Sequence, residues 1–161
     1  MTQTLPESVE IRPGEPSDAD TVASLWLELV QSQKRYGTHL KADANRHRAQ
    51  QTLARYAASD QLVVAESIGK ENLLGFVMFR VETQQYAVDV ARGLIENLYV
   101  TEDHRERGIG SALINRAERA LDERAVEVIA VEAMAENEHV QQLYRRHGYD
   151  PHRVVFEKPT E

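Results

Sequence analysis

The segment from Leu94 to Leu121 constrains the fold more than any other part of the chain, because a glycine turn in it joins a strand-like run to a helix-like run. Residues 94–100 are rich in β-branched and aromatic side chains, which favour a strand. Apolar residues then recur from Ile109 to Leu121 at the spacing of one helix face. Gly108 and Gly110 permit close approach to the backbone, and the first amides of a helix have no partners inside it. This combination predicts a site for an anionic ligand.

Two familiar anion-binding motifs do not match this turn. A P-loop requires Gly-Lys followed by Ser or Thr, and no lysine occurs between Lys70 and Lys158. A dinucleotide fingerprint requires a third small residue where this chain has Leu113. The alternative is a surface turn with solvated charges. That alternative gives no reason for two glycines in a first helical turn, where each costs up to about 1 kcal/mol relative to alanine.

Two motifs resemble those of a known family. The pattern R-x-x-G-x-G at Arg105, Gly108 and Gly110 resembles the phosphate-binding motif of the GNAT superfamily of N-acetyltransferases, and the flanking E-N-L-Y-V and S-A-L-I also look like the family pattern. Further along, the chain is similar to the family form N-x-x-A-x-x-L-Y-x-x-x-G-F at Asn137, Leu143, Tyr144, Gly148 and Tyr149. Val140 stands in place of the usual alanine. The resemblance covers roughly residues 62–156.

This resemblance implies the GNAT fold of the α/β (α+β) class. That fold is a mixed, mostly antiparallel central sheet, splayed to admit acetyl-CoA and flanked by about four helices. The residue patterns predict strands at 9–12, 61–67, 73–82, 94–100, 126–131 and 154–157. They predict helices from Ser17 to Gly37, from 43 to 58, after the glycine turn, and from Asn137. We expect residues 1–8 to form a flexible N-terminus and residues 9–158 a single domain.

Composition narrows the functional classes. The chain has no cysteine, which excludes a disulfide framework, a thiolate zinc site and an acyl-cysteine intermediate. The net charge of -7 argues against a nucleic-acid surface and mildly favours a cationic substrate such as an amine. We find no signal-peptide pattern and no apolar run of membrane-spanning length, so we expect a soluble, cytoplasmic protein. The histidines show no metal-binding spacing, and we expect no metal site.

The resemblance also implies how acetyl-CoA, the cosubstrate, would bind. Its pantetheine arm would lie along the backbone of Leu98, Tyr99 and Val100. Its pyrophosphate would rest on Arg107, Gly108, Ile109, Gly110 and Ser111. Arg105 would add charge or stiffen the turn. Asn137 would hold the cofactor or a neighbouring strand end, and the alternative for Asn137 is a plain helix N-cap.

Acyl transfer from a thioester to an amine requires a neutral nucleophile and a proton for the leaving thiolate. Glu96 is the candidate general base, because some family members carry a catalytic glutamate there; the alternative is an exposed or substrate-orienting glutamate. Tyr144 is the candidate acid and cofactor contact, with a packed core-edge tyrosine as the alternative. Tyr36 and His39 are candidate acceptor contacts, unless they belong to an ordinary interhelical loop.

We therefore expect an N-acetyltransferase that moves acetyl from acetyl-CoA to a primary amine by direct attack in a ternary complex. One alternative is a protein N-terminal or lysine acetyltransferase, and another is a non-catalytic CoA-binding regulatory module. Glu96 and Tyr144 argue against the regulatory module, because a pure binder needs neither. The expected partner is an amine-bearing small molecule or a peptide rather than nucleic acid or membrane, and a homodimer stays an open alternative.

Overall fold

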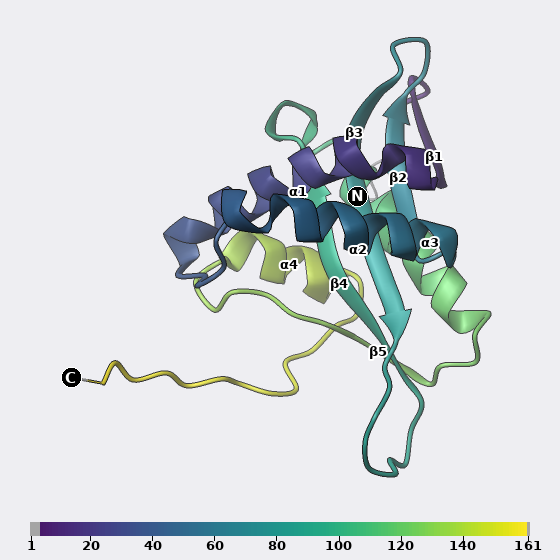
Figure 1. Ribbon diagram of the computed structural model, residues 1–161. Coiled ribbons are helices and arrows are strands. Elements are labelled where there is room, and N and C mark those ends of the chain that lie inside the picture. The colour runs from purple at the N-terminus through teal and green to yellow at the C-terminus, as the bar shows by residue number, and fades with distance from the viewer. Residues whose placement is uncertain (1–3, 161) are drawn as a thin grey trace.

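A five-stranded sheet forms the centre of the protein in the computed structural model, which describes residues 4–160 (Figure 1). The strands lie side by side in chain order, as β1 (Val9–Pro13), β2 (Leu62–Ser67), β3 (Asn72–Val81), β4 (Arg92–Val100) and β5 (Val128–Val131). The pairs β1–β2, β2–β3 and β3–β4 are antiparallel, and the pair β4–β5 is parallel. This mixed, mostly antiparallel sheet confirms the expected architecture.

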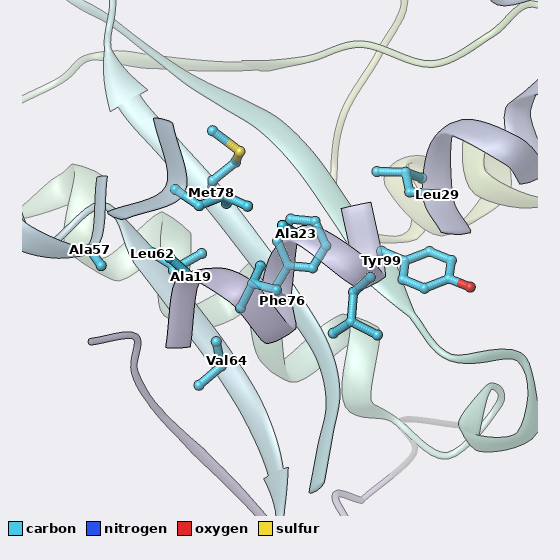
Figure 2. Close-up of a cluster of buried hydrophobic side chains, with 12 residues drawn as sticks. Ala19, Ala23, Leu29, Ala57, Leu62, Val64, Phe76, Met78 and Tyr99 are labelled. Carbon is cyan, nitrogen blue, oxygen red and sulfur yellow. The ribbon is translucent and has the colours of Figure 1, made fainter. Parts of the chain in front are cut away.

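Helices cover both faces of the sheet. Figure 1 shows α1 (Ala19–Gln33) and α2 (Arg46–Ala58) on one face and α3 (Ile109–Asp122) on the other. Alternate side chains of β3 serve the two faces, because successive residues of a strand point in opposite directions. Phe76 and Met78 pack beneath α1 and α2 (Figure 2), whereas Val77 and Phe79 pack in the cluster that includes α3. The fourth helix, α4 (Glu138–Arg146), follows β5.

Short 3-10 turns connect these elements, and they lie at η1 (Pro16–Asp18), η2 (Lys34–Tyr36), η3 (Asp43–Asn45) and η4 (Glu102–His104). The first of them displaces the predicted start of α1. Helix α1 begins at Ala19, and its N-cap residue is Asp18 rather than Ser17. The Asp18 carboxylate makes no cap of α1 and instead accepts a hydrogen bond from the Glu15 amide at 2.8 Å, at the start of η1. At the other end, Gly37 terminates η2 in a left-handed conformation with φ 93°, as the glycine predicted.

The predicted flexible N-terminus falls partly on residues 1–3, which lie outside the described residues. Within the described part, Leu5 packs against the core cluster on the α3 face. The carbonyl of Ser8 accepts a hydrogen bond from the Ile68 amide at 2.8 Å, which ties this segment to the turn between β2 and β3. Residues 5–8 therefore contribute to the packed body.

The predicted last strand at 154–157 was wrong. Residues 150–160 lie outside any strand, and every one of them is exposed. Figure 1 shows this segment, in yellow, running past α4 and away from the sheet. Val154, Val155 and Phe156 do favour a strand, but a strand also requires a hydrogen-bonding neighbour, and the segment does not return to one.

Candidate active site

The sheet opens between β4 and β5. The two strands pair from Arg92 opposite Val128 to Ile95 opposite Val131, where β5 ends. Strand β4 continues to Val100 and, over this half, pairs with β3 on one side only. No strand within residues 4–160 covers its other edge, so the backbone of Leu98, Tyr99 and Val100 borders the opening. The expected splay in the sheet is therefore present, and α4 follows directly after it in the chain.

A β-bulge stands where the opening begins. Met78 pairs with Asn97 and Phe79 pairs with Ile95, so Glu96 is an extra residue in β4. A bulge of this kind leaves one residue out of the ladder and re-aims its side chain. The carboxylate of Glu96 is thereby directed to the face that α1 and α2 cover.

Two partners hold the Glu96 carboxylate on that face. The hydroxyl of Tyr56 in α2 donates a hydrogen bond to Oε1 at 2.6 Å, and Nε of Arg80 in β3 lies 2.6 Å from the same oxygen. Burial and this hydrogen bond raise the pKa of Tyr56 to about 12. Neither partner was identified from the sequence, because their contact depends on the register of β3 against β4 and on how α2 packs.

The turn that follows β4 leads into the first backbone amides of α3. Gly108 is the N-cap of α3 with φ 81°, and no side chain among the described residues caps this helix start. Glu106 is also left-handed, with φ 62°. Ile109 is only 1% exposed and anchors the first turn in the α3-side core. The start of α3 therefore combines free N–H groups with the positive end of the helix dipole, which suits an anion.

Gly110 leaves room beside these amides. A Cβ atom added there would lie 3.8 Å from Cδ2 of Leu143 and 3.9 Å from Cγ2 of Val100, which is ordinary contact. Packing inside the protein therefore does not require glycine at this position. Gly75 differs, because its added Cβ would lie 2.5 Å from the carbonyl oxygen of Tyr99. Gly75 is needed for close approach of two strands, whereas the neighbours of Gly110 would accept a larger residue.

Arg105 and Arg107 occupy different environments. Nε of Arg105 donates a hydrogen bond to the carbonyl of Val100 at 3.0 Å, and its guanidinium carbon lies 5.5 Å from the centre of the Tyr99 ring. Arg105 thus fastens the end of β4 to the turn. Arg107 instead lines a cavity of about 180 Å³ beside the turn between β2 and β3, together with Lys70 and His104.

Ser111 connects α3 to the end of α4. Its hydroxyl lies 3.0 Å from Nε2 of His147, whose side chain is 14% exposed. Glu118, about two turns further along the same face of α3, accepts a hydrogen bond from the Tyr149 hydroxyl at 3.1 Å. The sequence suggested only a surface or helix-end role for His147. His147 directly follows the amphipathic α4, seven residues after Val140, so the sequence indicated that it continues the apolar face of this helix. The sequence did not indicate that its partner is Ser111.

Asn137 and Tyr144 lie on α4. Oδ1 of Asn137 accepts a hydrogen bond from the Val140 amide at 3.3 Å, so its side chain caps the helix. Tyr144 is 9% exposed, and burial raises the pKa of its phenol to about 12. Its ring packs edge-on against Tyr149, with centroids 6.0 Å apart. The hydroxyl makes no hydrogen bond within the described residues, and no polar side-chain atom fully buried there lacks a partner, so this hydroxyl reaches solvent.

The remaining predicted residues lie on the α1 and α2 side. The Tyr99 hydroxyl donates to Oε2 of Glu28 in α1 at 3.1 Å, and burial raises the pKa of Tyr99 to about 12. The ring therefore belongs to the core (Figure 2), and only the backbone of Tyr99 is available at the opening. His39 lies in the loop before α2, where Nε2 is 3.0 Å from Oε1 of Glu157. Tyr36 ends η2, where Arg35 lies over its ring.

The described residues also bear on metal binding and on membrane insertion. Within residues 4–160, no group of three or more His, Cys, Asp or Glu side chains is arranged to hold a metal ion. No helix in that range is both long enough and apolar enough to cross a membrane.

The sequence matches the family model described as the acetyltransferase (GNAT) family over residues 25–149. No curated protein sequence matches the chain. Among solved structures, a GCN5-related N-acetyltransferase from Ralstonia eutropha JMP134 is 29% identical, with a TM-score of 0.73 over 94% of this chain and 98% of that one.

Two more distant structures are similar in fold alone. Ribosomal-protein-alanine N-acetyltransferase from Brucella melitensis biovar Abortus 2308 is 19% identical, with a TM-score of 0.67 over 96% of this chain and 100% of that one. AAC(6')-Iy, in complex with the bisubstrate analogue CoA-S-monomethyl-acetylneamine, is 16% identical, with a TM-score of 0.66 over 94% of this chain and 98% of that one.

Proposed function

The chain belongs to the GNAT family of acetyltransferases, and from this premise we propose that it transfers acetyl from acetyl-CoA to a primary amine by direct attack in a ternary complex. One observation carries the proposal. The uncapped start of α3 adjoins the unpaired edge of β4, since a Cβ at Gly110 would lie within 3.9 Å of Val100. An elongated ligand with an anionic middle and a polar arm fits that arrangement.

The residues that would bind the cosubstrate supply backbone rather than side chains. The amides of Gly108, Ile109, Gly110 and Ser111 would donate to the pyrophosphate, and the free edge of Leu98, Tyr99 and Val100 would pair with the pantetheine amides. Arg107 would add positive charge near the turn, while Arg105 keeps the turn fastened to β4. When bound, acetyl-CoA supplies the thioester carbonyl that the amine attacks and the thiolate that leaves.

Glu96 is the proposed general base. Removing the proton from an alkylammonium with a pKa near 10.4 costs about 4 to 5 kcal/mol at pH 7, so a proton acceptor near the amine is required. The Glu96 carboxylate lies at the start of the opening, on the face of β4 that α1 and α2 cover, which supports this role. It would take the ammonium proton directly or through water, and Tyr56 and Arg80 would hold it in place.

Tyr144 is the proposed general acid. Burial keeps its phenol protonated at neutral pH, because its pKa is raised to about 12. Its hydroxyl has no partner within the described residues and is therefore free to donate to the departing sulfur. The ammonium would lose one proton to Glu96 before attack, and Glu96 would pass it to water. The nitrogen would lose a second proton as the C–N bond forms and the C–S bond breaks, and this proton would replace, through water, the one that Tyr144 gives to the thiolate.

The acceptor proposed is a cationic amine. The net charge of -7 and the carboxylates of Glu28 and Glu96 on the α1 and α2 side support it. Among proteins of similar fold, one is named for a ribosomal-protein alanine and another is bound to an acetylneamine analogue, so the fold accommodates both peptide and small amines.

The test combines two measurements on the same protein. Free thiol released from acetyl-CoA is followed across a panel of small amines and of peptides with free N-termini or lysines, and acetyl-CoA binding is measured by calorimetry. Amine-dependent thiol release supports the proposal, and the better acceptor class distinguishes metabolite from peptide. Tight binding without release for any amine would indicate the regulatory alternative, and absence of binding would refute the cofactor site.

A further inference from the structure

The cavity of about 180 Å³ lies where the turn between β2 and β3 meets the turn that leads into α3. Figure 1 shows the turn between β2 and β3 at the opposite end of the sheet from the loop that joins β3 to β4. Pockets for drug-sized ligands measure about 300 to 1,000 Å³, whereas one water takes up about 30 Å³ in the liquid. The cavity is therefore sized for a small ligand rather than for one trapped water or a whole cofactor.

The charged and titratable side chains that line this cavity all belong to basic residues. They are Lys70, His104 and Arg107, and no aspartate or glutamate is among the described lining residues, although the chain has 26 acidic residues against 19 lysines and arginines. The side chains of Lys70 and Arg107 have no hydrogen bond or ion pair within the described part of the chain. Nε of Arg92, by contrast, lies 2.6 Å from a carboxylate oxygen. The cavity therefore carries positive charge that the protein does not itself neutralise.

Backbone hydrogen bonds hold the walls of the cavity together. The Ile68 amide donates to the Ser8 carbonyl at 2.8 Å, and the Thr101 amide donates to the Leu74 carbonyl at 2.8 Å. Three buried apolar side chains also line the cavity, and they are Val9, Leu74 and Ile109. The wall segments are thus fixed to one another and to the core before any ligand binds.

Polar groups around the cavity can orient a bound anion. Nδ1 of His104 lies 2.9 Å from Oγ1 of Thr101, which fixes the ring and leaves Nε2 without a partner within residues 4–160. Ser8 and Ser67 also line the cavity, and their hydroxyls can donate hydrogen bonds. An oxyanion with several acceptor oxygens suits these donors better than a halide or a neutral molecule does.

We propose that this cavity binds a small phosphate group, either inorganic phosphate or the phosphate of a small monoester, at a site separate from that of acetyl-CoA. A guanidinium can bind two phosphate oxygens at once, and an ammonium adds a compact positive charge. The cavity and the surface beside Gly110 have different neighbours. An added Cβ at Gly110 would approach Leu143 and Val100, and neither of these residues lines the cavity.

An occupied cavity should weaken the binding of acetyl-CoA, and this coupling rests on the proposed function. Arg107 lines the cavity and immediately precedes Gly108, the N-cap of the helix start proposed to hold the pyrophosphate. Two anions that draw on the same arginine oppose each other, and each lowers the affinity of the other by the same factor. We expect a factor of about five, at the lower end of the usual range of coupling between two sites.

The first test is calorimetric titration of the full chain with inorganic phosphate, glycerol phosphate and acetate, in chloride buffers of constant ionic strength. Phosphate should bind at one site per chain and more tightly than acetate, and the tighter of the two phosphate ligands identifies the source. Lys70→Gln should weaken phosphate about 10-fold or more, through loss of a charged hydrogen bond. Lys41→Gln, at an exposed lysine outside the cavity, is the matched control. Absence of saturable binding, acetate binding as tight as phosphate, or equal losses in both variants would overturn the site.

The second test shows whether the cavity is separate from the acetyl-CoA site. Without phosphate, Lys70→Gln should bind acetyl-CoA as the wild type does, and Gly110→Ala should bind phosphate as the wild type does. Increasing phosphate should raise the wild-type Kd for acetyl-CoA to a plateau about fivefold higher, and this rise should be smaller at equal phosphate in Lys70→Gln.

The remaining outcomes of this second test have separate meanings. Weaker acetyl-CoA binding by Lys70→Gln without phosphate, or a Kd that rises without a plateau, would mean that both ligands use one site, and would overturn the proposal. A Kd for acetyl-CoA that does not respond to phosphate would overturn the coupling. Phosphate binding by a protein that binds no acetyl-CoA would refute the proposed function and support the phosphate site.

Discussion

Replacing Gly110 by alanine separates the needs of the fold from the needs of the ligand. The added methyl group would lie 3.8 Å from Leu143 and 3.9 Å from Val100, so the fold has room for it. Alanine also favours a helix over glycine by up to about 1 kcal/mol. We therefore expect the ligand-free variant to be more stable than the wild type by about 0.5 to 1 kcal/mol, which raises Tm by about 1 to 4 °C at this chain length.

The same methyl group should weaken acetyl-CoA, because it stands beside the amides proposed to bind the pyrophosphate. Loss of one hydrogen bond to a charged group costs about 1.5 to 3 kcal/mol, which corresponds to about 10- to 100-fold in affinity. At a cofactor concentration of a hundred times the wild-type Kd, the wild type gains about 2.7 kcal/mol of stability. The variant should gain only about 0.4 to 1.4 kcal/mol under the same conditions.

Thermal denaturation with and without acetyl-CoA measures both effects. The wild type should shift by about 5 to 11 °C, and Gly110→Ala should start higher and shift less. Ala120→Gly, in the same helix but far from the turn, is the matched control. It should lower the ligand-free Tm and leave the response to acetyl-CoA unchanged. A full response in Gly110→Ala would refute the assignment of the turn to the pyrophosphate.

Three further predictions concern single side chains. Tyr144→Phe should lower turnover by about 100-fold or more with little change in cofactor affinity or stability, since the hydroxyl has no protein partner; near wild-type turnover on a good acceptor would exclude the acid role. Glu96→Gln should depress turnover most at low pH, where the amine is least often neutral, and an unchanged pH profile and rate would leave Glu96 a structural role. Asp18→Asn tests a pH effect. The hydrogen bonds from Arg12 lower the pKa of Asp18 below its ordinary value of 3.8. The pair therefore stabilises the folded protein above that pH, and this contribution is lost as the pH falls through the lowered pKa of the folded state. Chemical denaturation should give the variant a lower free energy of unfolding than the wild type at pH 7, and a smaller decrease in that free energy as the pH falls. Parallel pH dependences of the two free energies would contradict this prediction.

The local parts of the site could be predicted from the sequence because their signals are local. The glycines at 108 and 110 marked the helix start, and Asn137 marked the N-cap of α4. Both depend on a few adjacent residues, and the structure places both as the pattern indicated. The roles proposed for these residues in binding acetyl-CoA stay predictions.

The features that sequence reasoning missed are all set by partners distant in the chain. The bulge at Glu96 requires the register of β3, and the contacts of Glu96 come from Arg80 and Tyr56. The contact between Ser111 and His147 joins two helices. The strand predicted at 154–157 was wrong for a related reason. A run of residues shows its β-propensity, but it does not show whether a neighbouring strand is available to pair with it.

The bulge in β4 makes Glu96 dispensable for the packing of the sheet. Ile95 and Leu98 pack toward α3, while Tyr99 packs toward α1. Removing Glu96 would leave these residues in regular alternation with the same faces inward, so the hydrophobic pattern of the strand is complete without it. Glu96 is thus an insertion that the sheet tolerates rather than needs. The insertion leaves a carboxylate and a pair of unladdered backbone groups where β4 and β5 separate.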